Sequence, residues 1–255
     1  MTASRDDVPS HSRFFHAIDI AGLDPVSGPR RRRPRAGLAA PIGVMLALLA
    51  AAAVVVPNRL ADRRNANESA AIATLKNIGS AQAQLQASGL IDVDRDGMGE
   101  YGFLAELSGA VVGRSGRRVA PPVLSAAFGD LVESRATVGG YLFQVYLPDH
   151  LLQGVIEDAD GGDAGNDNGV SARHAAALWC CYAWPVTRGW SGDRTFFTNQ
   201  SGDVLGTNGA VLGYDGLRHP CGPLSAFVTT ADTGLGSAIA VNAVGSDGNF
   251  WVIIG

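Results

Sequence analysis

The sequence lacks the patterns that identify a structural zinc site or a common catalytic site. It has three cysteines, with no CxxC pair and no Cys/His set at zinc-finger spacing, so a structural zinc is not expected. It also lacks the GxSxG turn of serine hydrolases and the glycine-rich loop that binds phosphates. These absences favour a protein that is not an enzyme.

The three cysteines leave two alternatives open. His174 precedes Cys180 by six residues and His219 precedes Cys221 by two, but neither pair has the surroundings of a known thiol nucleophile. In an oxidising compartment, one disulfide from Cys221 to Cys180 or Cys181 would leave one thiol over. The other hypothesis is that all three are small buried thiols.

Charged residues make up only 17% of the chain, and residues 37–56 contain none at all. Twenty helical residues cover about 30 Å, the thickness of a bilayer's hydrocarbon core. We therefore predict a transmembrane helix at 37–56; a cleaved secretory signal is the alternative. Residues 1–36 contain seven Arg and four Asp, which predicts a flexible basic tail.

The distribution of arginine predicts the orientation of the chain in the membrane. Arg30–Arg33 and Arg35 precede the uncharged segment as a dense cluster, and three more arginines follow it. The denser cluster favours a cytoplasmic N-terminus and an extracytoplasmic C-terminal part. We expect a single-pass protein of the inner (plasma) membrane, with membrane partners, no nucleic-acid partner and no predicted oligomeric state.

Residues 57–88 have the periodicity of an amphipathic helix that continues the membrane segment. Apolar residues recur at spacings of three and four, which places them on one face of a helix. The Ser88-Gly89 pair is typical of a helix end. The stripe consists of Ile72, Leu75, Ile78 and Leu85, with Ala71 and Ala81 between them.

Residues 89–255 read as short strands joined by turns. Residues 139–149 and 177–186 alternate large side chains in the way of strands. Residues 194–206 predict two strands joined at Ser201-Gly202-Asp203, and residues 240–255 predict a hairpin turning at Asp247-Gly248. A helix followed by antiparallel strands predicts an α+β fold, with the helix packed on the sheet.

This order of elements resembles that of type IV pilins and type II secretion pseudopilins. The likeness covers residues 37–204 and is strongest over 67–109, "NESAAIATLKNIGSAQAQLQASGLIDVDRDGMGEYGFLAELSG". The resemblance implies a pilin-like fold, 89–255 forming the sheet domain. It also implies a structural role in a type II secretion or type IV pilus-like apparatus, with other pilin-like or secretion-system membrane proteins as partners through the membrane helix.

The chain departs from the pilin pattern at the processing site. Prepilins are cut after a glycine, and the fifth residue after it is Glu; here the glycine is Gly37 and the fifth residue is Ile42. That Glu pairs with the N-terminal amine of a neighbouring subunit, and residues 37–56 contain no carboxylate. We therefore expect an uncleaved, membrane-tethered protein. The alternative function is a tethered extracytoplasmic module that binds calcium or another ligand.

An acidic stretch after the helix suggests a metal site. It matches positions 1, 3, 5, 6 and 9 of an EF-hand loop with Asp92, Asp94, Asp96, Gly97 and Glu100. Position 12 is Phe103, so the stretch is not an EF-hand. Four carboxylates this close repel one another, and Ca²⁺ would relieve the repulsion. The alternative is a solvated acidic turn that ends the helix.

Two further groups of residues are weaker candidates. The acidic run Asp158, Asp160, Asp163 and Asp167 is rich in glycine, which is typical of a surface loop. The aromatic residues suit either a ligand-binding face or a core. They are Trp179, Tyr182, Trp184 and Trp190.

Overall fold

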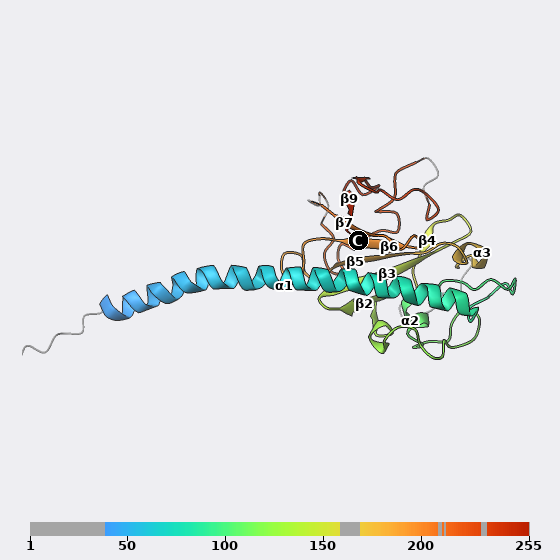
Figure 1. Ribbon diagram of the computed structural model, residues 1–255, viewed down its shortest axis with the longest axis horizontal. Helices are drawn as coiled ribbons and strands as arrows, with labels where there is room; N and C mark the ends of the chain where they lie inside the picture. Colours follow the sequence, from blue (N-terminus) through green and yellow to red (C-terminus); the bar gives the residue numbers. More distant parts are fainter. Residues whose placement is uncertain (1–38, 159–168, 209–210, 212, 231–233, 255) are drawn as a thin grey trace, which may run out of the picture. The chain divides into compact units, whose positions relative to one another are not determined.

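A single long helix, α1 (Ala39–Ser88), leads into the sheet. The computed structural model describes residues 39–158, 169–208, 211, 213–230 and 234–254 (Figure 1). The helix ends where its sequence predicts, because Gly89 takes a positive φ of 62° that a side chain would disfavour. The chain divides into two compact units, Met1–Leu49 and Ala50–Gly255.

The predicted membrane segment lies at the start of α1. Among the described residues, no helix combines the length and apolar character needed to cross a bilayer. The predicted tail at 1–36 lies outside the described residues. Of the predicted span at 37–56, only the side chains of Val44 and Met45 are described, and both are exposed. The span therefore stays a prediction.

The strands form one antiparallel sheet, so the α+β prediction is confirmed. The order of the strands is β1-β2-β3-β5-β6-β7-β9-β8, and β4 pairs with β3. The strands are β1 (Leu131–Val132), β2 (Arg135–Val138), β3 (Tyr141–Pro148), β4 (Gly154–Val155), β5 (Cys180–Pro185), β6 (Phe196–Asn199), β7 (Val204–Thr207), β8 (Ala243–Val244) and β9 (Phe250–Ile253). The short helical segments are α2 (Leu104–Leu107), η1 (Ala126–Phe128) and α3 (Ala172–Ala175). Both predicted hairpins are present, as β6–β7 and β8–β9.

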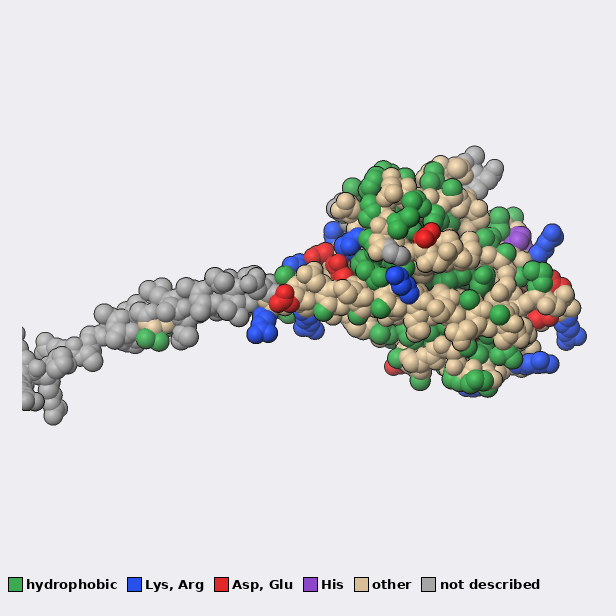
Figure 2. Space-filling model, viewed as in Figure 1, with side chains coloured by type: hydrophobic (Ala, Val, Ile, Leu, Met, Phe, Trp, Pro, Cys, Tyr) green, Lys and Arg blue, Asp and Glu red, His purple; other side chains and the backbone are tan. Residues whose placement is uncertain are grey.

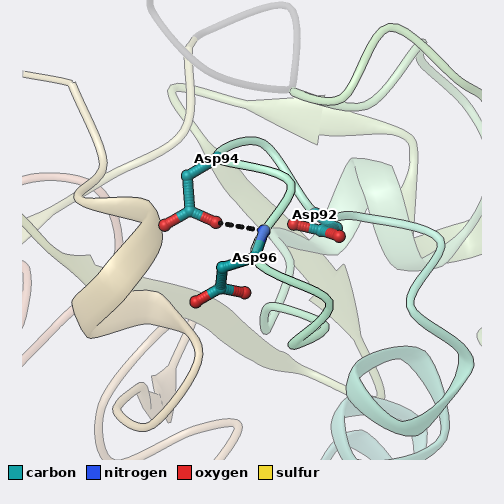
Figure 3. A group of neighbouring side chains, drawn as sticks. All are labelled: Asp92, Asp94 and Asp96. Atoms are coloured by element: carbon teal, nitrogen blue, oxygen red, sulfur yellow. Dashed lines mark hydrogen bonds between the residues drawn. The ribbon is translucent and has the colours of Figure 1, made fainter.

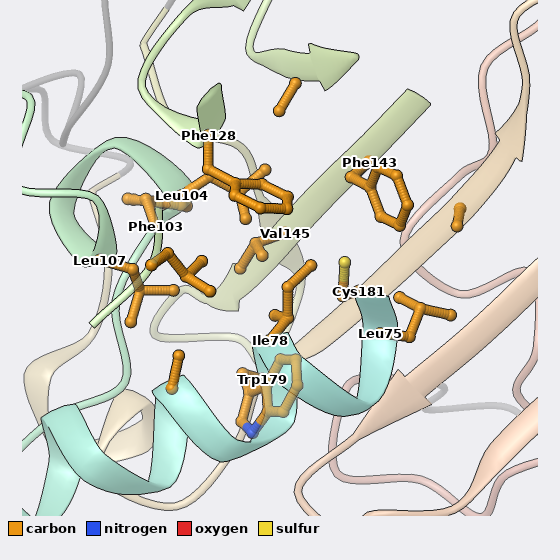
Figure 4. Close-up of a cluster of buried hydrophobic side chains, with 14 of the residues drawn as sticks. Leu75, Ile78, Phe103, Leu104, Leu107, Phe128, Phe143, Val145, Trp179 and Cys181 are labelled. Carbon is orange, nitrogen blue, oxygen red and sulfur yellow. The ribbon is translucent and has the colours of Figure 1, made fainter. Parts of the chain in front are cut away.

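Alternation along the strands divides the core between the two faces of the sheet. Successive side chains of a strand point to opposite faces. On one face, Phe143 and Val145 of β3 and Cys181 of β5 pack with Leu75 and Ile78 of α1 (Figure 4). The apolar stripe of α1 is therefore the helix's contact with the sheet, as predicted, although Ile72 is only partly buried.

The opposite face of the sheet is also covered, which the sequence did not predict. Tyr182, Trp184, Phe197 and Trp251 form a second cluster on it. The cover consists of loop residues between β7 and β9, including Phe227. Because both faces are covered, all eight residues of β3 are buried, where an open sheet would have alternated between buried and exposed.

Candidate metal site after helix α1

The acidic loop follows α1 at the end of the sheet where β3 finishes. After Gly89 the chain turns, and Asp92, Asp94 and Asp96 project around one short loop (Figure 3). One ligand oxygen from each lies within 4.8 Å of the others. Two oxygens that each lie about 2.3–2.6 Å from one Ca²⁺ ion are at most about 5 Å apart. The spacing of the three carboxylates therefore fits a shared calcium ion.

The loop holds this arrangement with its own hydrogen bonds. Asp92 Oδ2 accepts from Gly97 N at 3.2 Å, and Asp94 Oδ1 accepts from Asp96 N at 3.3 Å. Asp96 Oδ1 accepts from Met98 N at 2.7 Å. Each bond uses one oxygen of a carboxylate, so a second oxygen of each remains for a cation. Side chains that bond to nearby backbone N–H groups are common in turns, and a solvated turn would look the same in this respect.

One carboxylate oxygen distinguishes the two interpretations. Asp92 Oδ1 is buried and has no hydrogen-bond partner within the part of the chain that the structure describes. A buried acceptor without a partner is costly. A cation bound between the three aspartates would supply that partner. Asp94 and Asp96 are exposed, so an ion would reach the site directly from solvent.

Glu100 is not part of this group. Its Oε1 accepts from Val93 N at 2.7 Å, and its Oε2 pairs with Arg114 Nη1 at 2.8 Å. Burial raises the pKa of the Glu100 carboxyl, and the nearby Arg114 guanidinium opposes that rise. Glu100 therefore anchors the acidic loop to the domain, because both of its oxygens are engaged by these partners.

The buried network around Arg114 was not predicted from the sequence. The Arg114 side chain is 3% exposed and pairs with both Glu100 and Glu106. Glu106 also accepts from the backbone N–H groups of Phe103 and Arg114. In the sequence, each of these residues looks like a surface charge. Their proximity depends on how the loop after α2 returns to α1, and no local pattern indicates that path.

The remaining candidates are not members of the three-aspartate group. Cys180, Cys181 and Cys221 are free and buried, so the hypothesis of three buried thiols is confirmed. Burial raises the pKa of each thiol. His174 Nδ1 lies 3.0 Å from the Asp149 carbonyl oxygen. The second acidic run lies outside the described residues except for Asp158.

The aromatic residues do not form a binding face. Trp179, Tyr182 and Trp184 are buried in the two clusters, whereas Trp190 is exposed. The hypothesis of a ligand-binding aromatic face is therefore wrong, and the core hypothesis is confirmed for three of the four. The sequence could not separate them, because Trp190 differs only in lying beyond the end of β5.

Comparisons with known proteins yield no match: no protein-family model, characterised protein or solved structure is similar to this chain.

Proposed function

We propose that the chain is a membrane-anchored, pilin-like structural protein, a component or accessory of a type II secretion or type IV pilus-like apparatus. The observation that carries this proposal is α1, fifty residues long. Its C-terminal part packs into the core of an antiparallel sheet, and its N-terminal part carries the uncharged segment 37–56. A helix shared between lipid and a sheet domain is the feature on which the resemblance to pilins rests.

The proposed role is a permanent tether with its C-terminal domain outside the cell's inner membrane. With Ile42 in place of the processing Glu, the chain lacks the carboxylate that would register it in a fibre. Small residues in the span, such as Ala50–Ala53, permit close approach of other membrane helices. Contact with secretion-system partners would be made there.

A non-enzymatic role is the simplest account of the polar residues. A reactive cysteine needs a lowered pKa and access to solvent, whereas the three thiols are buried and their pKa values are raised. The buried Arg114–Glu100 pair is occupied in holding the acidic loop.

The mass of the mature protein, extracted from membranes, tests the proposal. An intact mass of 26.4 kDa in the membrane fraction, with secretion-system membrane proteins co-purifying, is the expected result. A mass shortened by residues 1–37 would replace the permanent tether with a processed fibre subunit. Recovery in the soluble fraction would refute membrane anchorage.

The second candidate function is a tethered calcium-binding module, favoured by the unpartnered Asp92 Oδ1. An exposed extracytoplasmic site would bind Ca²⁺ weakly, with a Kd of about 10⁻⁴–10⁻³ M. Isothermal titration with Ca²⁺ tests it, using Asp92→Asn and Asp94→Asn, which keep an acceptor oxygen but lose charge. Asp203→Asn, at the exposed β6–β7 turn, is the matched control. Equal heats from all variants would exclude the site.

A further inference from the structure

The loop between β5 and β6 holds one large aromatic side chain out in solvent. Trp190 is 52% exposed, whereas Trp179, Trp184 and Trp251 are at most 2% exposed. The sequence has four tryptophans, so this is the exposed one. Burying an indole is favourable because its apolar area is large. The exposed Trp190 side chain does not contribute this burial free energy to the stability of the domain.

Hydrogen bonds within the loop hold it in one conformation. Trp190 N and Ser191 N both donate to Thr187 O, at 3.1 and 2.8 Å. Thr187 N donates to Ser191 Oγ at 3.0 Å, and Gly189 N donates to Gly192 O at 2.9 Å. The exposure of Trp190 is therefore built into the fold of the loop.

The same loop is fastened to α1 near the start of the sheet domain. Asn67 Nδ2 donates to Ser191 O at 2.8 Å, and Arg64 Nη1 pairs with Asp193 Oδ2 at 2.7 Å. Glu68 Oε1 accepts from the backbone N–H groups of Asp193 and Arg194. The contacts lie on residues 64–68 of the helix, which places the loop at the end of the domain that is nearer in sequence to the uncharged segment.

Further apolar surface borders the loop at this end. Val186 is 37% exposed and Leu217 is 39% exposed. Both line a hollow of about 450 Å³ together with Leu142 and Thr187. Val186 belongs to the same loop as Trp190, and Leu217 lines the same hollow as Val186. We call these three exposed residues the apolar rim.

This end of the domain is basic in a chain that is acidic overall. Residues 57–68, 186–194 and 213–218 contain six arginines and four carboxylates, while the whole chain has a net charge of −4. Figure 2 shows charged side chains gathered where α1 enters the domain. Arg59, Arg63, Arg188 and Arg218 are exposed there. Exposed tryptophan beside arginine is the combination that favours the headgroup layer of a bilayer.

The helix sets the height of the loop above a membrane. At about 1.5 Å per residue, Arg64 lies about 12 Å beyond Val56, the end of the predicted span. The headgroup layer is about 5–8 Å thick on each side. A helix tilt of about 20° lowers a loop by about 3–4 Å for every 10 Å between it and the helix axis. A tilt towards the loop would therefore bring the indole nearer to the headgroup layer.

We propose that Trp190 and its apolar rim dock onto the surface of an anionic phospholipid bilayer and fix the orientation of the sheet domain on the membrane. This inference rests on the proposed membrane anchorage, and it adds a second, surface contact to the transmembrane one. The arginines bind lipid phosphates while the indole lies among the headgroups.

Tryptophan fluorescence of the full chain, reconstituted into vesicles of phosphatidylglycerol and phosphatidylcholine, tests the inference. Lipids brominated near the headgroup end of the acyl chain should quench part of the emission more strongly than lipids brominated near the chain terminus. Trp190→Phe should abolish the quenchable part. Vesicles of phosphatidylcholine alone should reduce the quenching, because the arginines lose their partners.

A relocated tryptophan is the matched control. Leu151 is 78% exposed and follows β3 at the opposite end of the sheet, so Leu151→Trp in the Trp190→Phe background should show no lipid quenching. Its circular dichroism spectrum, with that of Trp190→Phe, should match the parent chain.

Three outcomes would overturn the inference. If the chain inserts into the vesicles but acrylamide in solution quenches Trp190 and brominated lipid does not, docking is refuted and anchorage stands. If neither quencher reaches Trp190, a second copy of the chain covers it instead. If the chain stays outside the vesicles, the inference and the proposed anchorage both fail.

Discussion

At the scale of single residues, the polar groups buried between α1 and the sheet domain carry definite structural tasks. Gln82 lies on the buried face of α1, where its side-chain amide donates to Gly102 O at 2.7 Å and accepts from Gly102 N at 2.9 Å. A buried peptide group without partners would be costly. The side chain therefore replaces the strand that would otherwise pair with this part of the loop.

Replacing Gln82 with Ala should destabilise the domain by about 1–3 kcal/mol, because both polar groups of Gly102 would lose their partner. Urea unfolding followed by circular dichroism measures the difference. Gln84→Ala is the matched control, since Gln84 is exposed and its side-chain amide donates to Ser80 O within the same helix. An equal, small effect of both substitutions would show that water satisfies Gly102.

Glu100 predicts a dependence of stability on pH. Burial raises the pKa of its carboxyl in the folded protein above its ordinary value of 4.5, so the folded state binds the proton more tightly than the unfolded state. Its contribution to stability is then fully present below pH 4.5 and is lost as the pH rises through the raised pKa. Arg114, Asp94 and Glu106 are the charges that act on it.

The Glu100→Gln variant should lack this contribution, because its side chain does not titrate. Relative to the variant, the parent chain should lose free energy of unfolding as the pH rises from 4 towards neutrality, and then stay level. Urea midpoints over that range test the sign. A difference that grows in the parent's favour with pH would mean that the ion pair with Arg114 outweighs burial.

At the scale of elements, α1 is organised by its apolar stripe. Leu75, Ile78 and Leu85 are fully buried, and Ala71 and Ala81 fill the narrower positions between them. The residues that the sequence period places on one face of the helix are the residues buried in the structure, because one face of α1 packs against one face of the sheet. Ile72 is only partly buried, since it lies at the margin of that contact.

Ile78→Ala should lower the free energy of unfolding by about 2–5 kcal/mol, the usual cost of a cavity in a closely packed core. Thermal and urea unfolding measure it. Asn77→Ala removes an exposed side chain one position earlier and should change stability by less than about 0.5 kcal/mol. Similar losses of unfolding free energy from both substitutions would mean that Ile78 does not lie in the packed contact between α1 and the sheet.

The sheet is an element whose second cover was not predictable. The loops between β7 and β9 have no period of three to four or of two, yet Phe227, Leu235 and Ala240 from them are buried against β5, β6 and β9. Among the described residues of these loops, strand-like backbone pairing occurs as isolated bridges, such as that between Phe227 and Ile239. Apolar residues in an irregular segment give no indication of which surface they cover.

At the scale of the whole molecule, the described contacts of the domain's core begin well after the uncharged segment. The described residues of the cluster between α1 and the sheet begin at Ala71. The contacts that fasten the Trp190 loop to α1 begin at Arg64. Val44 and Met45, the residues before 57 whose side chains are described, belong to neither.

A chain of residues 57–255 should therefore fold with the stability of the full chain, to within about 1 kcal/mol, because none of the described core contacts is removed. It should also leave the membrane fraction, since it lacks the uncharged segment. Chemical unfolding and membrane fractionation measure the two properties separately. A folded fragment that still sediments with membranes would locate the anchor in the sheet domain.

The sequence by itself determined the α+β class, the stripe and end of α1, and the two hairpins, because these depend on local periodicity and turn residues. It also placed three aspartates on one loop. Only the tertiary structure separated Glu100 from them, buried three tryptophans while exposing Trp190, and brought Arg114 to Glu100 and Glu106. These outcomes depend on contacts between residues far apart in the chain, and no local pattern encodes which partner a buried charge or an aromatic ring will meet.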